Sequence, residues 1–497
     1  MIESTRLVLI GGAVVLPDGV RRGLGVHVEG GRIVDLTDRE PPVGARVIEL
    51  DGRLVTPGLI DLHVHGGAGY SFDRPSRSVE GRAAEGAAAW SGGATAGAGG
   101  PDAHAISMGS GFPDAHSMGD GESDAHALGG GGPDTHALGG GGPDAHALGG
   151  GGPDAHSMGV GFPDAHSMGV GFPDAVTLVL RHLARAGVTS AQASLVSSDV
   201  PDLVSWLDDP IWTAARPADA AELLGVHLEG PFLAATQCGA HDPAVLRAPS
   251  RDDVAALLSH RELIRMITLA PELPGAIEAV RRFAEAGIVV AAGHSEATAA
   301  DLAAATDAGL THVTHLWSGQ STTTRRGPWR VPGLLEASLA ATGLTAEVIA
   351  DGHHLPPELL EIARRCLGDR LIVVSDGTPG TGLPTGSRYD LGTVRCEVGD
   401  GVGMVVGADS FGGSTATLPR LLAHLHDELG WPLTEVVTAA TSRPAAVAGV
   451  ADRKGVVEVG MDADLAVFDP GFRPWGTVLR GRWTPNAPTA PDDRRSS

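Results

Sequence analysis

Residues 59–65 read Leu-Ile-Asp-Leu-His-Val-His, an apolar run in which every second side chain is polar. Side chains alternate between the two faces of a β-strand, so Asp61, His63 and His65 share one face and the aliphatic residues share the other. Two imidazoles on one face can bind the same metal ion. Two hydrogen-bonded structural histidines would give the same pattern, so this stretch alone leaves both interpretations open.

Short apolar runs of this kind recur along the chain and alternate with helical patterns, which is typical of βα units around a parallel sheet. Eight such strands are the number that closes a (β/α)8 barrel. The sequence therefore predicts an α/β fold, a (β/α)8 TIM-like barrel within residues 57–450. The predicted strands span residues 59–65, 188–195, 224–229, 265–270, 288–293, 311–315, 346–351 and 371–376.

Both ends of the chain have a different pattern from the barrel. Residues 1–56 and 451–484 contain alternating apolar runs broken by glycine-containing turns, which is typical of antiparallel strands. We expect these two segments to form one small β-sandwich beside the barrel. Residues 485–497 are polar and contain proline, so we expect a tail there.

A ten-residue repeat close to Gly-Gly-Gly-Gly-Pro-Asp-Ala-His-Ala-Leu interrupts the barrel within residues 75–174, before a helical pattern at 176–186. The zone holds 27 of the 72 glycines and few large apolar side chains, so it cannot offset the entropy of ordering its backbone. We expect a disordered insertion in the first βα connection. Two alternatives stay open: loose metal binding by its histidines, or a Ca²⁺-binding β-helix, although the period is ten and proline recurs. The repeat histidines are His104, His116, His126, His136, His146, His156 and His166.

The overall composition limits the classes of partner and compartment. The net charge is −24, with 36 Lys+Arg against 60 Asp+Glu, which argues against nucleic acid or an anionic membrane as the main partner. Three cysteines do not make a disulfide framework and fit a reducing compartment. The sequence has no signal-peptide pattern and no run of about 18 apolar residues. We therefore expect a soluble, cytoplasmic protein.

Four histidines and two carboxylates lie at the ends of five predicted strands, where the active-site residues of barrels lie. Imidazole and carboxylate ligands without paired thiolates suit Zn²⁺, or Fe²⁺, Co²⁺ or Mn²⁺. Such an ion lowers the pKa of water and polarises a carbonyl, which indicates a hydrolase. Asp376 is the candidate to accept the proton of the water, with a cap on the following turn as its alternative role. The six residues are His63, His65, Glu229, His294, His315 and Asp376.

Seven segments, taken in chain order, resemble those of the amidohydrolase superfamily and, within it, the N-acetylglucosamine-6-phosphate deacetylase family. They are PGLIDLHVHGGAG, GVHLEGPFL, GAHDP, AAGHSEAT, THVTHLWSG, ADGHHL and VVSDGT. The resemblance implies a metal-dependent enzyme that removes acetate from N-acetylglucosamine-6-phosphate, with one or two divalent ions per subunit. The implied ligands are Glu229, His294 and His315 for the principal ion and His63 and His65 for a second. The resemblance also implies that Asp376 is the acid/base.

The same resemblance implies residues that bind the substrate. His354 aligns with the residue that polarises the substrate carbonyl, and His241 with a histidine that contacts the sugar. A Trp-Ser-Gly segment replaces the family's phosphate-binding Asn-Ala-Met segment, so we expect Ser318 and Gly319 to contact the substrate. Arg330 is then the candidate for the phosphate. Because family members form homodimers in which an arginine reaches the neighbouring subunit's phosphate, we expect a homodimer.

Two other functions stay open at this point. The replaced Asn and Met leave room for a different N-acyl amino sugar or another N-acyl substrate. A non-catalytic metal-binding scaffold, with the repeat as its active part, is the second alternative. The complete set of ligands together with Asp376 argues against the scaffold, because a degenerated site should have lost some of them.

Overall fold

The computed structural model describes residues 6–73 and 172–485. All the repeat histidines lie outside the described residues, so the expected disordered insertion and its metal-binding and β-helix alternatives stay predictions. The expected tail after residue 485 lies outside them as well. Within the described part, none of the helices is long and apolar enough to cross a lipid bilayer.

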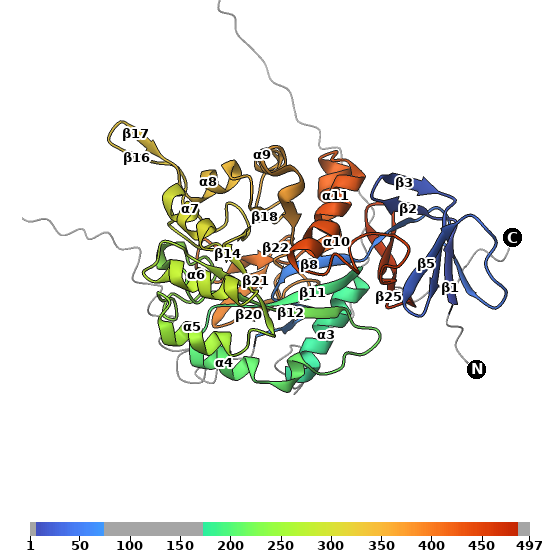
Figure 1. Cartoon of the computed structure of the whole chain (residues 1–497), viewed down its shortest axis with the longest axis horizontal. Helices are drawn as coiled ribbons and strands as arrows, with labels where there is room; N and C mark the ends of the chain where they lie inside the picture. The colour runs from blue at the N-terminus through green and yellow to red at the C-terminus, as the bar shows by residue number, and fades with distance from the viewer. Residues whose placement is uncertain (1–5, 74–171, 486–497) are drawn as a thin grey trace, which may run out of the picture. The chain divides into compact units, whose positions relative to one another are not determined.

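Eight strands form one parallel sheet in the order β19-β18-β15-β14-β13-β12-β11-β8. Figure 1 labels β8, β11 and β12 of this sheet near the middle of the view. The two outer strands meet, because Val64 at the end of β8 bridges in parallel to Gly377 beyond β19. The amide of Asp376 also donates to the carbonyl of His63 over 2.9 Å. The predicted (β/α)8 barrel is therefore confirmed. The strands are β8 (Leu59–Val64), β11 (Val188–Leu195), β12 (Glu222–Glu229), β13 (Ile264–Leu269), β14 (Val289–Ala292), β15 (His312–Val313), β18 (Thr345–Val348) and β19 (Leu371–Val373).

Helices cover the outer face of this sheet, so the strands are buried on both faces, as in β11, where all eight residues are buried. The helix sequences explain the packing: α6 buries Ala276, Ala279, Val280 and Phe283, which form one stripe at helical spacing. The helices are α3 (Phe172–Arg185), α4 (Val200–Leu207), α5 (Arg251–Leu258), α6 (Ala276–Glu285), α7 (Ala299–Asp307), α8 (Leu334–Ala340), α9 (Pro357–Leu367), α10 (Leu418–Ala423), α11 (Leu433–Ala439) and α12 (Ser442–Val447).

The two chain ends meet in a pair of sheets, as the sequence predicts. One sheet has the order β5-β4-β1-β6 and the other β26-β25-β24-β7-β2-β3, in which β24 from the C-terminal part pairs antiparallel with β7 from the N-terminal part. A separate apolar cluster that includes Leu9, Val26 and Leu465 lies in this region. The strands are β1 (Arg6–Ile10), β2 (Ala13–Leu16), β3 (Gly19–Arg22), β4 (Gly25–Glu29), β5 (Arg32–Thr37), β6 (Arg46–Glu49), β7 (Leu54–Pro57), β24 (Leu465–Asp469), β25 (Arg473–Leu479) and β26 (Arg482–Pro485).

A buried ion cluster joins this sandwich to the barrel. Lys454 is the single lysine of the chain, and its ammonium is buried 2.9 Å from Glu222 of β12. The same ammonium contacts Asp464, which lies just before β24, and approaches Asp462 to 3.8 Å. A buried ammonium needs such partners because an unpaired buried charge is costly. The three carboxylates therefore hold Lys454 and leave no reason to assign a metal ion to this cluster.

Three strand elements were not predicted from the sequence, and one of them is a short hairpin of β9 (Gly66–Gly67) and β10 (Tyr70–Ser71) directly after β8. The other two bear on the site. A four-stranded antiparallel sheet follows β19, with β20 (Arg388–Leu391), β21 (Val394–Val398), β22 (Val402–Val405) and β23 (Phe411–Ser414). A hairpin of β16 (Thr324–Arg326) and β17 (Trp329–Val331) extends away from the barrel helices (Figure 1, upper left). The four-stranded sheet supplies one wall of the cavity described below, and the β16–β17 hairpin carries Arg330.

The pH dependence of stability should include a contribution from His182 on α3. Its Nε2 is buried with no hydrogen-bond partner among the described residues, and burial together with Arg185 lowers its pKa to about 4. The unfolded chain takes up this proton near pH 6.5, so the stabilisation is complete above that pH and is lost as the pH falls toward 4. When the pH falls from 8 to 5, we expect the free energy of unfolding of His182→Leu to decrease by about 1–2 kcal/mol less than that of the parent protein. Urea unfolding at each pH measures both. Parallel pH curves for the two proteins would contradict this assignment.

Candidate active site

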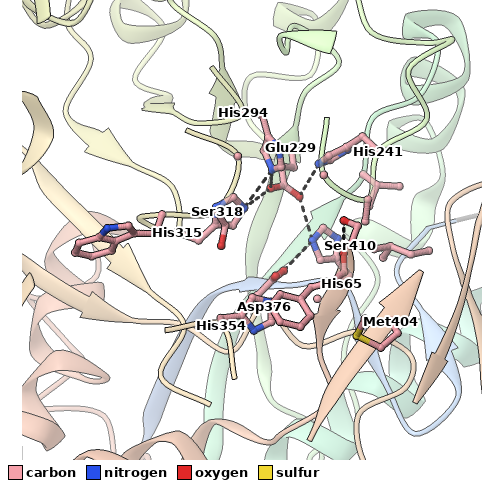
Figure 2. A pocket seen from close by; sticks show the side chains of 18 of the residues that line it. His65, Glu229, His241, His294, His315, Ser318, His354, Asp376, Met404 and Ser410 are labelled. Atoms are coloured by element: carbon pink, nitrogen blue, oxygen red, sulfur yellow. Dashed lines mark hydrogen bonds and ion pairs between the residues drawn. The ribbon is translucent and has the colours of Figure 1, made fainter. Parts of the chain in front are cut away.

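A cavity of about 380 Å³ opens at the ends of the barrel strands (Figure 2). Its residues come from just beyond the carboxyl ends of the strands and from the β20–β23 wall, which is where barrel enzymes place their chemistry. Nine of the residues predicted from the sequence line it. These are His65, Glu229, His241, His294, His315, Ser318, Gly319, His354 and Asp376.

Glu229 lies at the centre of this group and contacts histidines through both carboxylate oxygens. Oε1 lies 2.9 Å from Nε2 of His315 and 3.1 Å from Nε2 of His294. Oε2 lies 3.2 Å from Nε2 of His65 and 3.4 Å from Nε2 of His63. Burial by itself would raise the pKa of Glu229, but the surrounding imidazoles, His63 foremost, hold it well below its usual range. The carboxylate is therefore ionised and connects two groups of ligands.

The two groups form two half-sites on either side of Glu229. The first half-site consists of His63, His65 and Asp376, whose Oδ1 lies 3.4 Å from Nε2 of His65 and 3.6 Å from Nε2 of His63. The second half-site consists of His294 and His315. His63 lies behind the cavity wall, in contact with the other members of the first half-site. The structure thus brings all six strand-end residues together, although the assignment of five of them as ligands and of Asp376 as the acid/base stays a prediction.

The donor set fits divalent metal ions. The Nε2 atoms of His63 and His65 lie 3.2 Å apart, and those of His294 and His315 lie 3.3 Å apart. Nitrogens bound to one tetrahedral Zn²⁺ at about 2.0–2.1 Å lie about 3.4 Å from each other, so both spacings suit a shared ion. His294 donates from Nδ1 to the carbonyl of Gln237 over 2.7 Å, so Nε2 is the nitrogen that can bind a metal ion.

His241 differs from the other histidines because its hydrogen bonds place the proton on the inward nitrogen. The amide of Ser197 donates to Nδ1 over 3.2 Å, and Nε2 lies 3.4 Å from Oε2 of Glu229. Burial lowers the pKa of His241 to about 4, so the ring is neutral and carries its one proton on Nε2. In this state His241 is a donor rather than a metal ligand, which agrees with the substrate-contacting role expected from the sequence.

Asp376 has an unusual backbone conformation beside the first half-site. Its φ is +47°, and His294 and Trp317, which also border the cavity, have φ values of +46° and +71°. Non-glycine residues rarely adopt these angles, and the strain is found most often at functional sites. Burial opposes ionisation of Asp376, but hydrogen bonding to His65 and the charge of His63 lower its pKa below the usual value. The side chain is therefore a carboxylate that can accept a proton.

His354 lines the same cavity as Asp376 and packs against Phe411 of the β20–β23 wall. Its Nδ1 donates to Asp351 Oδ2 over 2.7 Å, so Nε2 is the nitrogen left for a substrate. Burial would raise the pKa of Asp351, but the hydrogen bond from His354 lowers it, so the anion holds the ring from behind. The ring lies 4.7 Å from that of Phe411, which lines the wall together with Met404 and Ser410.

Two buried carboxylates near the first half-site were missed by the sequence analysis, and one predicted residue lies elsewhere. Glu347 and Asp73 are buried carboxylates near the half-sites, and an acid inside a predicted apolar strand was the available signal for Glu347. Arg330 does not line the cavity of its own chain, because it is exposed on the β16–β17 hairpin. No lysine or arginine is among the described residues that line the cavity.

Comparison with known proteins decides the family. Residues 172–490 match the model of the amidohydrolase family. The N-acetylglucosamine-6-phosphate deacetylase of Vibrio furnissii is 31% identical over 312 residues, which cover 63% of this chain and 77% of that protein. The chain belongs to the N-acetylglucosamine-6-phosphate deacetylase family of amidohydrolases. The resemblance stated from the sequence motifs is thereby confirmed.

Other deacetylases are also similar to this chain. The Homo sapiens N-acetylglucosamine-6-phosphate deacetylase is 35% identical over 314 residues, covering 62% of this chain and 75% of that protein. A Mycobacterium smegmatis deacetylase, solved in complex with N-acetyl-D-glucosamine-6-phosphate, has 25% identity and a TM-score of 0.69, covering 97% of this chain and 99% of that one. An N-acetylgalactosamine-6-phosphate deacetylase of Escherichia coli O157:H7 is 28% identical, covering 61% of this chain and 78% of that protein.

Proposed function

We propose that the chain hydrolyses N-acetylglucosamine-6-phosphate to glucosamine-6-phosphate and acetate, with one or two divalent ions, of which zinc is our first choice. The observation that carries this proposal is the placement of Glu229 between two pairs of imidazoles, with Asp376 beside them in one cavity. A divalent ion bound there lowers the pKa of water and polarises the amide carbonyl. The remaining chemistry depends on the side chains.

Asp376 has the position and the charge for proton transfer. As water attacks the acetyl carbon, Asp376 accepts a proton from it, and it returns that proton to the sugar nitrogen as the C–N bond breaks. His354, whose Nδ1 is held by Asp351, presents Nε2 to the acetyl oxygen on which charge develops. His241 presents its Nε2 proton toward a sugar oxygen. The products are acetate and the free amine, so the atoms of water are distributed between them.

Binding of the phosphate needs a cation that the described cavity does not contain. Arg330 on the β16–β17 hairpin is the candidate, and Trp329 on the same hairpin is 74% exposed. We propose a homodimer in which Arg330 of the partner subunit reaches the phosphate. A cytoplasmic location is likewise a proposal, and it rests on three cysteines without disulfide bonds.

The test is acetate release by the purified full chain loaded with Zn²⁺. N-acetylglucosamine-6-phosphate should be turned over, and N-acetylglucosamine without the phosphate should react far more slowly. The replaced Asn-Ala-Met segment and the galactosamine relative support a second candidate substrate, N-acetylgalactosamine-6-phosphate. Equal turnover with and without phosphate would refute the proposed specificity, and no acetate from any of the three would refute the reaction.

A further inference from the structure

Glu347 is a buried carboxylate directly behind the two half-sites. It lies on β18, and its side chain has no exposed surface. Taking an ionised carboxylate out of water is costly unless hydrogen-bond donors surround it. Both of its oxygens accept hydrogen bonds inside the barrel, from His63, His312 and the backbone of His315. The proposed reaction does not use this anion, so its position calls for another role.

The donors to Glu347 come from two other strands of the barrel. Oε2 lies 3.2 Å from Nδ1 of His63 and 3.3 Å from the backbone nitrogen of His315, and Oε1 lies 3.0 Å from Nε2 of His312. An ionised carboxylate can only accept hydrogen bonds, so His63 donates from Nδ1 and His312 from Nε2. The other nitrogen of His312 faces the Thr345 hydroxyl at 2.6 Å, which completes its partners.

The contact with Nδ1 orients the ring of His63 in the first half-site. The contact with the backbone nitrogen holds His315, a member of the second half-site. Because its Nδ1 donates to Glu347, His63 presents Nε2 toward Glu229 as the nitrogen left to bind a metal ion. The backbone contact fixes the point from which His315 enters the second half-site. We infer that Glu347 is a positioning residue that orients both half-sites for metal binding, with its stronger effect on the first. This inference rests on the proposed metal site.

The difference between the half-sites follows from what holds each ring. In the second half-site, His294 donates to the neutral carbonyl of Gln237, independently of Glu347. In the first, His63 donates to an anion, which makes the imidazole a stronger ligand. The Nδ1 atoms of His65 and His315 have no partner among the described residues, so neither ring is held in this way. The first half-site therefore depends on Glu347 for its one anchored ring.

The substitution Glu347→Gln tests the inference with little change in side-chain volume. A glutamine has one acceptor oxygen where three donors converge, and it carries no charge, so it cannot hold His63, His312 and His315 together. Loss of such a partner typically weakens metal binding by about 10- to 100-fold. We expect this loss of metal affinity at the first half-site, and a much smaller change of affinity at the second. We also expect kcat to fall while KM stays close to that of the parent.

The experiment is a Co²⁺ titration of the metal-depleted full chain, followed by visible absorption and by metal analysis. The matched control is Asp464→Asn, which removes a buried carboxylate paired with Lys454 and remote from the half-sites. The control should lower Tm but keep the cobalt spectrum and Kd. The inference is overturned if Glu347→Gln lowers Tm and leaves the cobalt spectrum and Kd of both sites unchanged. Cobalt binding needs no turnover, so a wrong substrate proposal would leave this result standing.

A second variant keeps the inference testable if Glu347→Gln does not accumulate as folded protein. His312→Asn removes one donor to Oε1 and leaves all the proposed ligands in place. We expect the same class of cobalt site to weaken, by less than in Glu347→Gln, because His63 and His315 still contact the carboxylate. An unchanged cobalt Kd in His312→Asn, with a folded protein by circular dichroism, would contradict the inference.

Discussion

Asp376→Asn should lower kcat for acetate release by about 100- to 10,000-fold, the usual contribution of a positioned acid/base group. The amide cannot accept the proton of the attacking water and cannot return it to the leaving nitrogen. KM should change little, because the shape of the cavity is retained. Steady-state kinetics with N-acetylglucosamine-6-phosphate gives both parameters, and metal analysis of the same sample shows whether the ions are retained.

The chain offers a matched control for the backbone of this variant. Asp51 in the sandwich also has a positive φ, +48°, and is exposed. Asparagine tolerates this conformation, so neither Asp376→Asn nor Asp51→Asn should add strain. Asp51→Asn should keep the parent kcat. If Asp376→Asn kept its metal and lost less than tenfold in kcat, the acid/base would have to be another group.

The strand ends were predictable from sequence because a metal-ligand histidine interrupts an apolar run at a recognisable place. His63 and His65 alternate with buried aliphatic residues, Glu229 ends a buried strand, and His315 follows one. In a closed parallel barrel all such ends lie around one rim, so local patterns along the chain suffice to assemble the ligands. For this reason, the sequence alone could predict that these six residues from five strands lie together.

Residues that act through pairing between distant strands could not be found in the same way. Glu347 lies inside a predicted strand. Its proposed role depends on hydrogen bonds from His63, His312 and His315, which are close to it only in the closed barrel. The wall residue Phe411 comes from a short antiparallel sheet that has no chemical motif. Arg330 was expected near the phosphate, but it lies on the exposed β16–β17 hairpin, so its proposed role requires a second subunit.

Glu229→Gln should abolish more metal binding than the loss of any single histidine. Both oxygens of Glu229 face imidazoles, Oε1 toward the second half-site and Oε2 toward the first. An amide would present one oxygen and one NH2 group, so at least one half-site would face a donor instead of an acceptor. His63→Asn should weaken only the first half-site and His294→Asn only the second. The three variants are dialysed against the same low Zn²⁺ concentration, and metal analysis then gives the zinc content of each.

The activity of Glu229→Gln should fall with its metal content. Polarisation of a carbonyl by a bound ion is worth several kcal/mol, and about 4 kcal/mol corresponds to about 1,000-fold in kcat/KM. Glu435→Gln is the control, because Glu435 of α11 pairs with Arg364 of α9 among the helices that surround the barrel sheet. It should keep both metal and activity. A Glu229→Gln protein that retained the parent's metal content and lost less than tenfold in kcat/KM would show that the two half-sites do not share this carboxylate.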